Sequence, residues 1–184
     1  MIWSLVLFTH VVGVLALFVG LGLEWIGMDG IQRSTTRAEA LPWLRLISIV
    51  PRLFGTALAA IVVSGFYLGA RVGVLGNDWM RASYGALLLM AIVSGPVSRS
   101  PMRALKRLAD VPADGTAALA AAANPILRLS LRIRVAFGLA IVFLMIAKPA
   151  AAEALLVLAL ALIVTIATSL TRRTAPTTAA QGYR

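Results

Sequence analysis

Two ionisable side chains in the first apolar stretch are the residues best able to do chemistry. His10 and Glu24 belong to a series that recurs at steps of three and four residues and also contains Gly13, Leu17, Gly20 and Gly27. Such steps place residues on one face of a helix. Because an ionisable side chain in a membrane-spanning segment is costly, it is by default a functional candidate. This face of the predicted helix is therefore the first place to look for a site.

The glycines on this face of the helix, called the glycine stripe below, predict where the helix packs against a neighbouring helix. Glycine lets a neighbouring helix approach closely, as small residues do at helix contacts in membranes. We therefore expect Gly13, Gly20 and Gly27 to be helix-packing positions that face the interior of a bundle.

Glu24 is predicted to form an interhelical ion pair with Arg52. Glu24 lies near the inner end of the first apolar stretch, and Arg52 lies near the inner end of the second. The two stretches run in opposite directions, so the two side chains are expected at a similar depth. A pair of this kind is more often structural than catalytic.

His10 is the only histidine of the chain and lies roughly 12 Å from the outer end of its helix, at a rise of about 1.5 Å per residue. It either forms a hydrogen bond across helices or binds a haem iron, a copper ion or a quinone, or passes a proton. Tyr67 and Tyr84 are expected at the same depth on the next two apolar stretches. The sequence thus predicts a small ligand site of His10, Tyr67 and Tyr84, with His10 as the metal ligand if a metal binds. The identity of the cofactor stays open.

Several other chemistries are excluded by the residues present. The chain has no cysteine, which rules out disulfides and thiolate metal sites. One histidine cannot form a bis-histidine haem site within one chain. His10 and Glu24 are 14 residues apart, about 21 Å along a helix, so they cannot share a reaction centre. We therefore predict that the protein is not an enzyme, and reject a lipid-modifying activity of these two residues.

The elements that must position these residues are apolar helices. Sixty per cent of the residues are hydrophobic and the mean hydropathy is +0.93. The apolar stretches do not alternate as barrel strands would. The predicted fold class is all-α, a polytopic transmembrane helical bundle of residues 1–173 with five spans, an inner loop at 98–130 and a disordered tail at 174–184. The predicted spans are residues 2–27, 47–70, 79–97, 131–147 and 150–170.

The distribution of positive charge predicts the orientation. The net charge is +10, and arginine supplies most of it. The segment between the first two spans carries Arg33, Arg37 and Arg45, and the segment after the third span and the tail are also basic. By the positive-inside rule the N-terminus lies outside and the C-terminus inside. These arginines are interpreted as topology signals that also contact anionic lipid headgroups at the inner face, and not as a nucleic-acid surface.

Three short motifs carry a resemblance to a known group of proteins. They are residues 8–13 (FTHVVG), residues 64–68 (SGFYL) and residues 79–81 (WMR), within roughly the first hundred residues. In these motifs the chain resembles small uncharacterised bacterial integral membrane proteins that are distantly similar to the membrane domain of copper-resistance protein D. The resemblance implies a multi-pass helical bundle in the bacterial inner membrane that handles a metal or haem.

Two functions follow from these expectations. In the first, the protein binds or passes a small ligand of metal, haem or quinone type within its bundle. In the second, it is an accessory subunit that packs against a larger membrane complex or forms a homo-oligomer. The glycine stripe fits either function, and so does the small fraction of the chain that is predicted to lie outside the membrane.

Overall fold

The computed structural model of the chain describes residues 1–94 and 125–171, and this part is all-α, as predicted. The predictions for residues 98–124 and for the tail at 174–184 lie outside the described residues. The helices are α1 (Ile2–Arg33), α2 (Arg37–Val72), α3 (Asp78–Ser94), α6 (Pro125–Ala147) and α7 (Ala151–Thr171).

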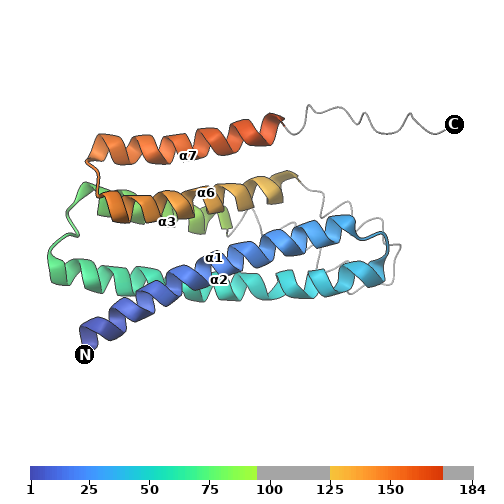
Figure 1. Cartoon of the computed structure of the whole chain (residues 1–184), viewed down its shortest axis with the longest axis horizontal. Coiled ribbons are helices and arrows are strands. Elements are labelled where there is room, and N and C mark those ends of the chain that lie inside the picture. Colours follow the sequence, from blue (N-terminus) through green and yellow to red (C-terminus); the bar gives the residue numbers. More distant parts are fainter. Residues whose placement is uncertain (95–124, 172–184) are drawn as a thin grey trace.

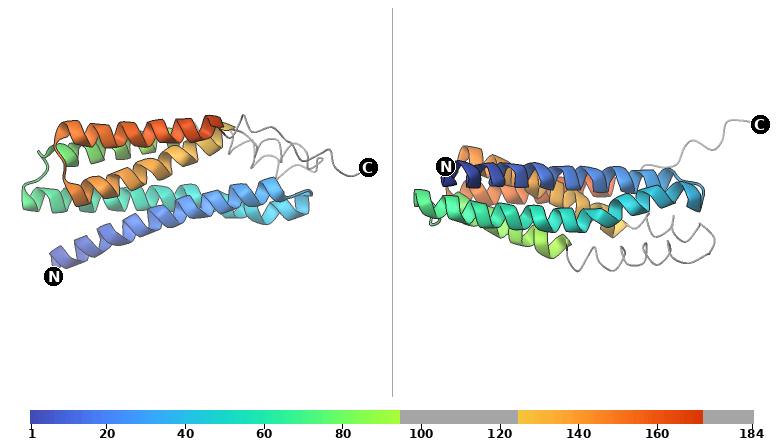
Figure 2. Two further views of the ribbon diagram at one scale, coloured as in Figure 1. Left: turned by 45° about the horizontal axis from the view of Figure 1, so that its top comes forward. Right: turned by 90° about the horizontal axis from the view of Figure 1, so that it is seen from below.

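The described helices lie side by side along one long axis (Figure 1). α1 and α2 form an antiparallel, crossing pair on one side, α6 and α3 lie beside that pair, and α7 is outermost (Figures 1 and 2). The α1–α2 connection is at one end of the bundle. The N-terminus and the α2–α3 and α6–α7 connections are at the other end, so chain direction alternates from helix to helix (Figure 1).

Four of the helices are long and apolar enough to cross a membrane. These are α1, α2, α6 and α7, with mean hydropathies of 2.1 to 2.3 over their most apolar windows. Together they have the character of a membrane helical bundle. The described part of α3 has 17 residues, so the third of the five predicted spans stays a prediction.

The first inner segment is shorter than the predicted span limits imply. Those limits left residues 28–46 between the helices, whereas α1 continues to Arg33 and α2 begins at Arg37. Thr36 caps α2, because its hydroxyl oxygen accepts a hydrogen bond from the Glu39 backbone N–H at 3.4 Å. The Glu39 carboxylate in turn accepts from the Thr35 N–H at 2.9 Å. Hydropathy marks only the most apolar part of a helix, while this capping pattern marks where the helix begins.

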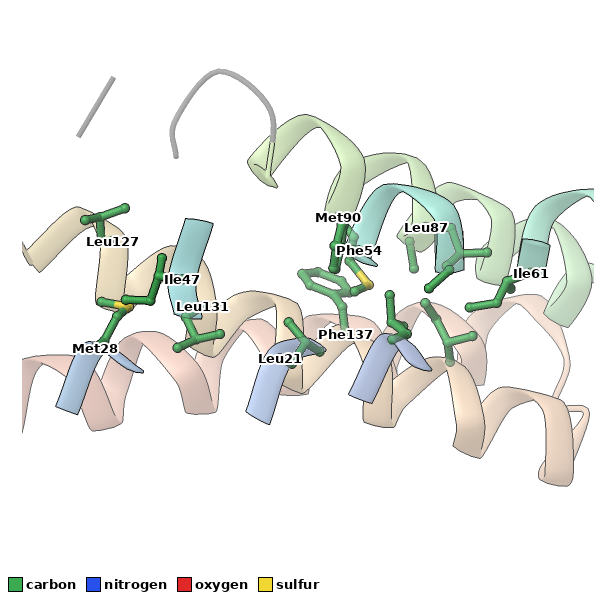
Figure 3. Packing of buried hydrophobic residues seen from close by; sticks show 14 of the residues in the cluster. Leu21, Met28, Ile47, Phe54, Ile61, Leu87, Met90, Leu127, Leu131 and Phe137 are labelled. Atoms are coloured by element: carbon green, nitrogen blue, oxygen red, sulfur yellow. The ribbon is translucent and has the colours of Figure 1, made fainter. Parts of the chain in front are cut away.

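Apolar side chains from four helices fill the interior. Figure 3 shows this cluster along the bundle, with Leu127 and Met28 towards one end and Leu87 and Ile61 towards the other. α7 contributes little to it, since Leu155, Leu156 and Leu160 are more than 60% exposed. An outer surface of this kind fits lipid better than water.

The glycine stripe of α1 lies against α2. A Cβ on Gly13 would lie 3.1 Å from Ile61 Cγ1, and one on Gly27 would lie 2.6 Å from Ile47 Cγ1. Gly20 is less tightly covered, with Leu53 at 3.6 Å from the same position. α1 and α2 thus approach most closely where α1 carries no side chain, which fixes how α1 is rotated about its own axis.

Candidate functional site

Glu24 forms a bidentate ion pair with Arg134 of α6. Arg134 Nη1 lies 2.7 Å from Glu24 Oε2, and Arg134 Nη2 lies 2.5 Å from Glu24 Oε1. The two side chains are 3% and 4% exposed, so the pair is buried. Parallel N–H donors facing two carboxylate oxygens form the strongest geometry available to such a pair.

The other groups around Arg134 complete its surroundings. Its Nε donates to the Ser130 backbone carbonyl at 3.3 Å. Its guanidinium lies 5.5 Å from the centre of the Phe54 ring of α2, within the range of a cation–π interaction. The ion pair therefore joins α1, α2 and α6 in the interior and restrains their relative positions.

The predicted pairing of Glu24 with Arg52 is wrong, because Arg52 is exposed. Equal depth along two helices does not determine the rotation of each helix about its axis. Phe54, two residues further on, is buried, and two residues correspond to a rotation of about 200°. Arg52 therefore lies on the opposite face of α2 from the interior.

The sequence does contain a signal for Arg134. Buried residues of α6 recur at steps of three and four, and Arg134 occupies one position of that apolar face. The others on this face are Leu127, Ser130, Leu131, Phe137, Ile141 and Leu144. An arginine on a buried helix face needs a carboxylate partner, but the prediction interpreted the basic residues near this helix only as topology signals.

His10 lies against the turn of α2 that contains Ser64 and Gly65. Its Nδ1 is 3.1 Å from the Ser64 hydroxyl oxygen. That hydroxyl donates its hydrogen to the Ala60 backbone carbonyl. Because the hydroxyl uses its hydrogen in that bond, it can only accept from the ring, so the tautomer assigned from this network has its hydrogen at Nδ1 and a lone pair at Nε2.

Tyr84 of α3 reaches the same point on α2. The position of a Cβ on Gly65 would lie 3.1 Å from His10 Cε1 and 3.6 Å from the Tyr84 hydroxyl oxygen. A side chain here would displace one of the two groups, so Gly65 allows them to converge. Within the described residues, the buried Tyr84 hydroxyl has no hydrogen-bond partner. A buried hydroxyl of this kind is unusual, since most find an acceptor.

Tyr67, the third member of the predicted trio, has different surroundings. Its ring lies under the Arg71 guanidinium, 5.5 Å from ring centre to Cζ. It lines a hollow at the end of the bundle together with Arg71, Ile2 and Trp3. The structure therefore brings His10 and Tyr84 to one point and places Tyr67 elsewhere.

The surroundings of His10 offer few further metal ligands. Among the residues that the structure describes, no three His, Asp or Glu side chains gather in a way that could hold a metal ion. His10 itself presents a single ring nitrogen.

Ser64 and Gly65 are the site residues that the sequence reasoning missed. Both belong to the motif at residues 64–68, of which only Tyr67 was predicted as a site residue. Phe66 is 58% exposed. The steps from Ile61 to Ser64 and Gly65 follow the buried face of α2 and would have identified them.

Comparison with protein-family models, with curated proteins and with solved structures finds no match.

Proposed function

We propose that this chain is a non-enzymatic integral membrane protein that binds a small lipid-soluble ligand of quinone type, with the head group of the ligand at His10 and Tyr84. The single observation that carries the proposal is the unpartnered buried hydroxyl of Tyr84, beside the same glycine as the His10 ring. The proposal concerns binding or passage of the ligand and assigns no bond-breaking step.

The two groups have complementary hydrogen-bonding capacity. The Tyr84 O–H can donate to a carbonyl oxygen, and His10 Nε2 can accept from a hydroxyl. A quinone presents carbonyl oxygens, and its reduced form presents hydroxyl groups. Because a site of one donor and one acceptor serves both forms, it suits this class of head group better than a metal ion or a purely apolar molecule.

Access to the site is from the lipid side. His10 is half-buried, while Leu7 and Val11 beside it on α1 are 44% and 48% exposed. A ligand dissolved in the bilayer can reach the ring without crossing water. Ligand sites that bind lipid-soluble molecules combine an apolar approach with a few placed polar groups.

The membrane in this proposal is the bacterial inner membrane, crossed five times. α3 is the additional span. The N-terminus faces outward and the C-terminus inward, so His10 lies in the outer half of the bilayer. The basic segments between α1 and α2 and before α6 support this orientation by the positive-inside rule.

Calorimetric titration tests the proposal. The full-length protein in detergent is titrated with a short-chain benzoquinone, and the same titration is run with Tyr84→Phe and His10→Ala. Loss of one hydrogen bond is expected to weaken binding by up to about tenfold. Tyr67→Phe is the matched control, because it removes the same hydroxyl group outside the site.

Three results decide the question. Saturable one-to-one binding that weakens in Tyr84→Phe and is unchanged in Tyr67→Phe supports the site. Absence of binding, or equal loss in both tyrosine variants, contradicts it. If the protein binds no quinone and purifies in fixed ratio with a larger membrane complex, the accessory-subunit function replaces the ligand-binding one.

A further inference from the structure

A second polar feature lies near the end of the bundle where α1 meets α2. There, α1 and α6 line a partly open cavity of about 120 Å³. Trp25, Asp29 and Gln32 line it from α1, and Arg128 and Arg132 line it from α6. The cavity is separate from the ligand site, since His10 and Trp25 are 15 residues apart, about 22 Å along α1.

The charge of this cavity is positive. Arg128 and Arg132 are one helical turn apart, so both side chains lie on one face of α6. The single acidic group, Asp29, is paired with Arg33 at 2.8 Å, which compensates its charge. The cavity therefore has two arginines and no uncompensated carboxylate among the residues that line it.

Arg132 is held in position by α7. Its Nη1 donates to the Ser169 hydroxyl oxygen at 3.0 Å and to the Thr168 carbonyl at 3.5 Å. A guanidinium is planar and has five N–H donors. Arginine pairs with phosphate oxygens through two parallel hydrogen bonds, which makes it the usual residue for phosphate recognition.

The position of the cavity in the fold adds to its preference for anions. α6 begins at Pro125, so Arg128 is in its first turn. The N-terminal end of a helix carries a partial positive charge and favours negative groups. Trp25 is 47% exposed, as tryptophans at the level of lipid headgroups are.

We propose that this cavity binds a phosphate group, and that an anionic phospholipid of the surrounding membrane supplies it. The phosphate accepts from Arg128 and Arg132, and the acyl chains lie against the exposed apolar surface of the bundle. This site does not depend on the proposed quinone site.

Native mass spectrometry of the full-length protein in detergent tests the site. The protein is titrated with phosphatidylglycerol, with phosphatidylcholine and with inorganic phosphate. Phosphatidylglycerol is expected to bind first and one to one, and removal of one arginine in Arg128→Gln is expected to weaken binding about fivefold. Arg45→Gln and Arg52→Gln are matched controls, because both residues are exposed arginines of α2.

A conservative variant separates binding from folding. Arg128→Lys keeps the charge and is expected to retain more affinity than Arg128→Gln, whereas loss of folding would also lower the helix content measured by circular dichroism. Equal binding of the two lipids, or equal weakening by Arg45→Gln and Arg128→Gln, overturns the proposal. Displacement of the lipid by inorganic phosphate at equal concentration overturns the lipid as the source.

Discussion

Glu24 and Arg134 lie 110 residues apart in the sequence and form a bidentate ion pair in the interior, between α1 and α6. The pair connects the α1–α2 hairpin to the group of α3, α6 and α7. Taking two charges out of water costs several kcal/mol each, and good geometry must compensate that cost. The pair therefore specifies how the two groups of helices dock.

Removal of one partner of this pair leaves the other buried and uncompensated. Glu24→Gln and Arg134→Gln are each expected to lower the free energy of unfolding by about 3–5 kcal/mol. The measurement is reversible unfolding in mixed micelles, followed by circular dichroism. Arg52→Gln, on the exposed face of α2, is the control and is expected to change stability by less than about 0.5 kcal/mol.

The double variant Glu24→Gln/Arg134→Gln is expected to lose much less than the sum of the two single losses, because neither charge remains. Strictly additive losses would show that the two residues do not interact. A large loss in Arg52→Gln would favour the pairing that depth alone predicts.

Gly27 tests the close approach of α1 and α2. In Gly27→Ala the new methyl group would lie 2.6 Å from Ile47 Cγ1, so one of the helices must shift. We expect a loss of about 1–3 kcal/mol, as for other overpacked positions. Gly22→Ala is the matched control, since a Cβ there meets nothing within 4 Å. Equal stability of the two variants would contradict the observed packing.

Ser64 tests the orientation of His10. In Ser64→Ala the Nδ1 hydrogen loses its acceptor, so we expect a loss of about 1 kcal/mol in stability and weaker benzoquinone binding. Ser83→Ala is the control, because the Ser83 hydroxyl donates to the Trp79 carbonyl of its own helix at 2.8 Å. Thermal unfolding and calorimetry measure both effects. Unchanged binding in Ser64→Ala would separate His10 from the ligand.

Cysteine labelling tests the orientation in the membrane. α2 has 36 residues and is about 54 Å long, so both of its ends extend past a hydrocarbon core of about 30 Å. In a chain without cysteine, Asn77→Cys should react with an impermeant maleimide in intact cells, and Thr35→Cys only after permeabilisation. Equal reactivity of the two variants would contradict the proposed crossing.

The helices were predictable because long apolar stretches specify them locally, and four of the five predicted spans correspond to span-capable helices. The partner of Glu24 was not predictable by depth. Arg52 points away from the interior of the bundle, whereas Arg134 points into it. These directions depend on how each helix is rotated about its own axis, and tertiary contacts such as that of Phe54 with the core fix this rotation. The spacing of the apolar residues along α6 would have identified Arg134 as a residue that faces the interior.

The candidate site was predictable to the same extent, because spacing along a helix can be read from the sequence and the rotation of the helix about its axis depends on tertiary contacts. The position of His10 on the glycine-bearing face of α1 was readable from spacing, and Tyr84 was expected near it. Tyr67 is two residues beyond Gly65 and therefore on another side of α2. Equal depth alone predicted that Tyr67 belongs to the site, whereas the rotation of α2 about its axis places Tyr67 beside Arg71.

Infrared spectroscopy of a carbonyl-labelled benzoquinone bound to the protein tests the central claim most directly. A hydrogen bond from the Tyr84 hydroxyl lowers the stretching frequency of the carbonyl. We predict a lower frequency in the wild type and in Tyr67→Phe than in Tyr84→Phe. The same frequency in all three proteins would show that Tyr84 donates no hydrogen bond to the ligand, and would contradict the proposed site.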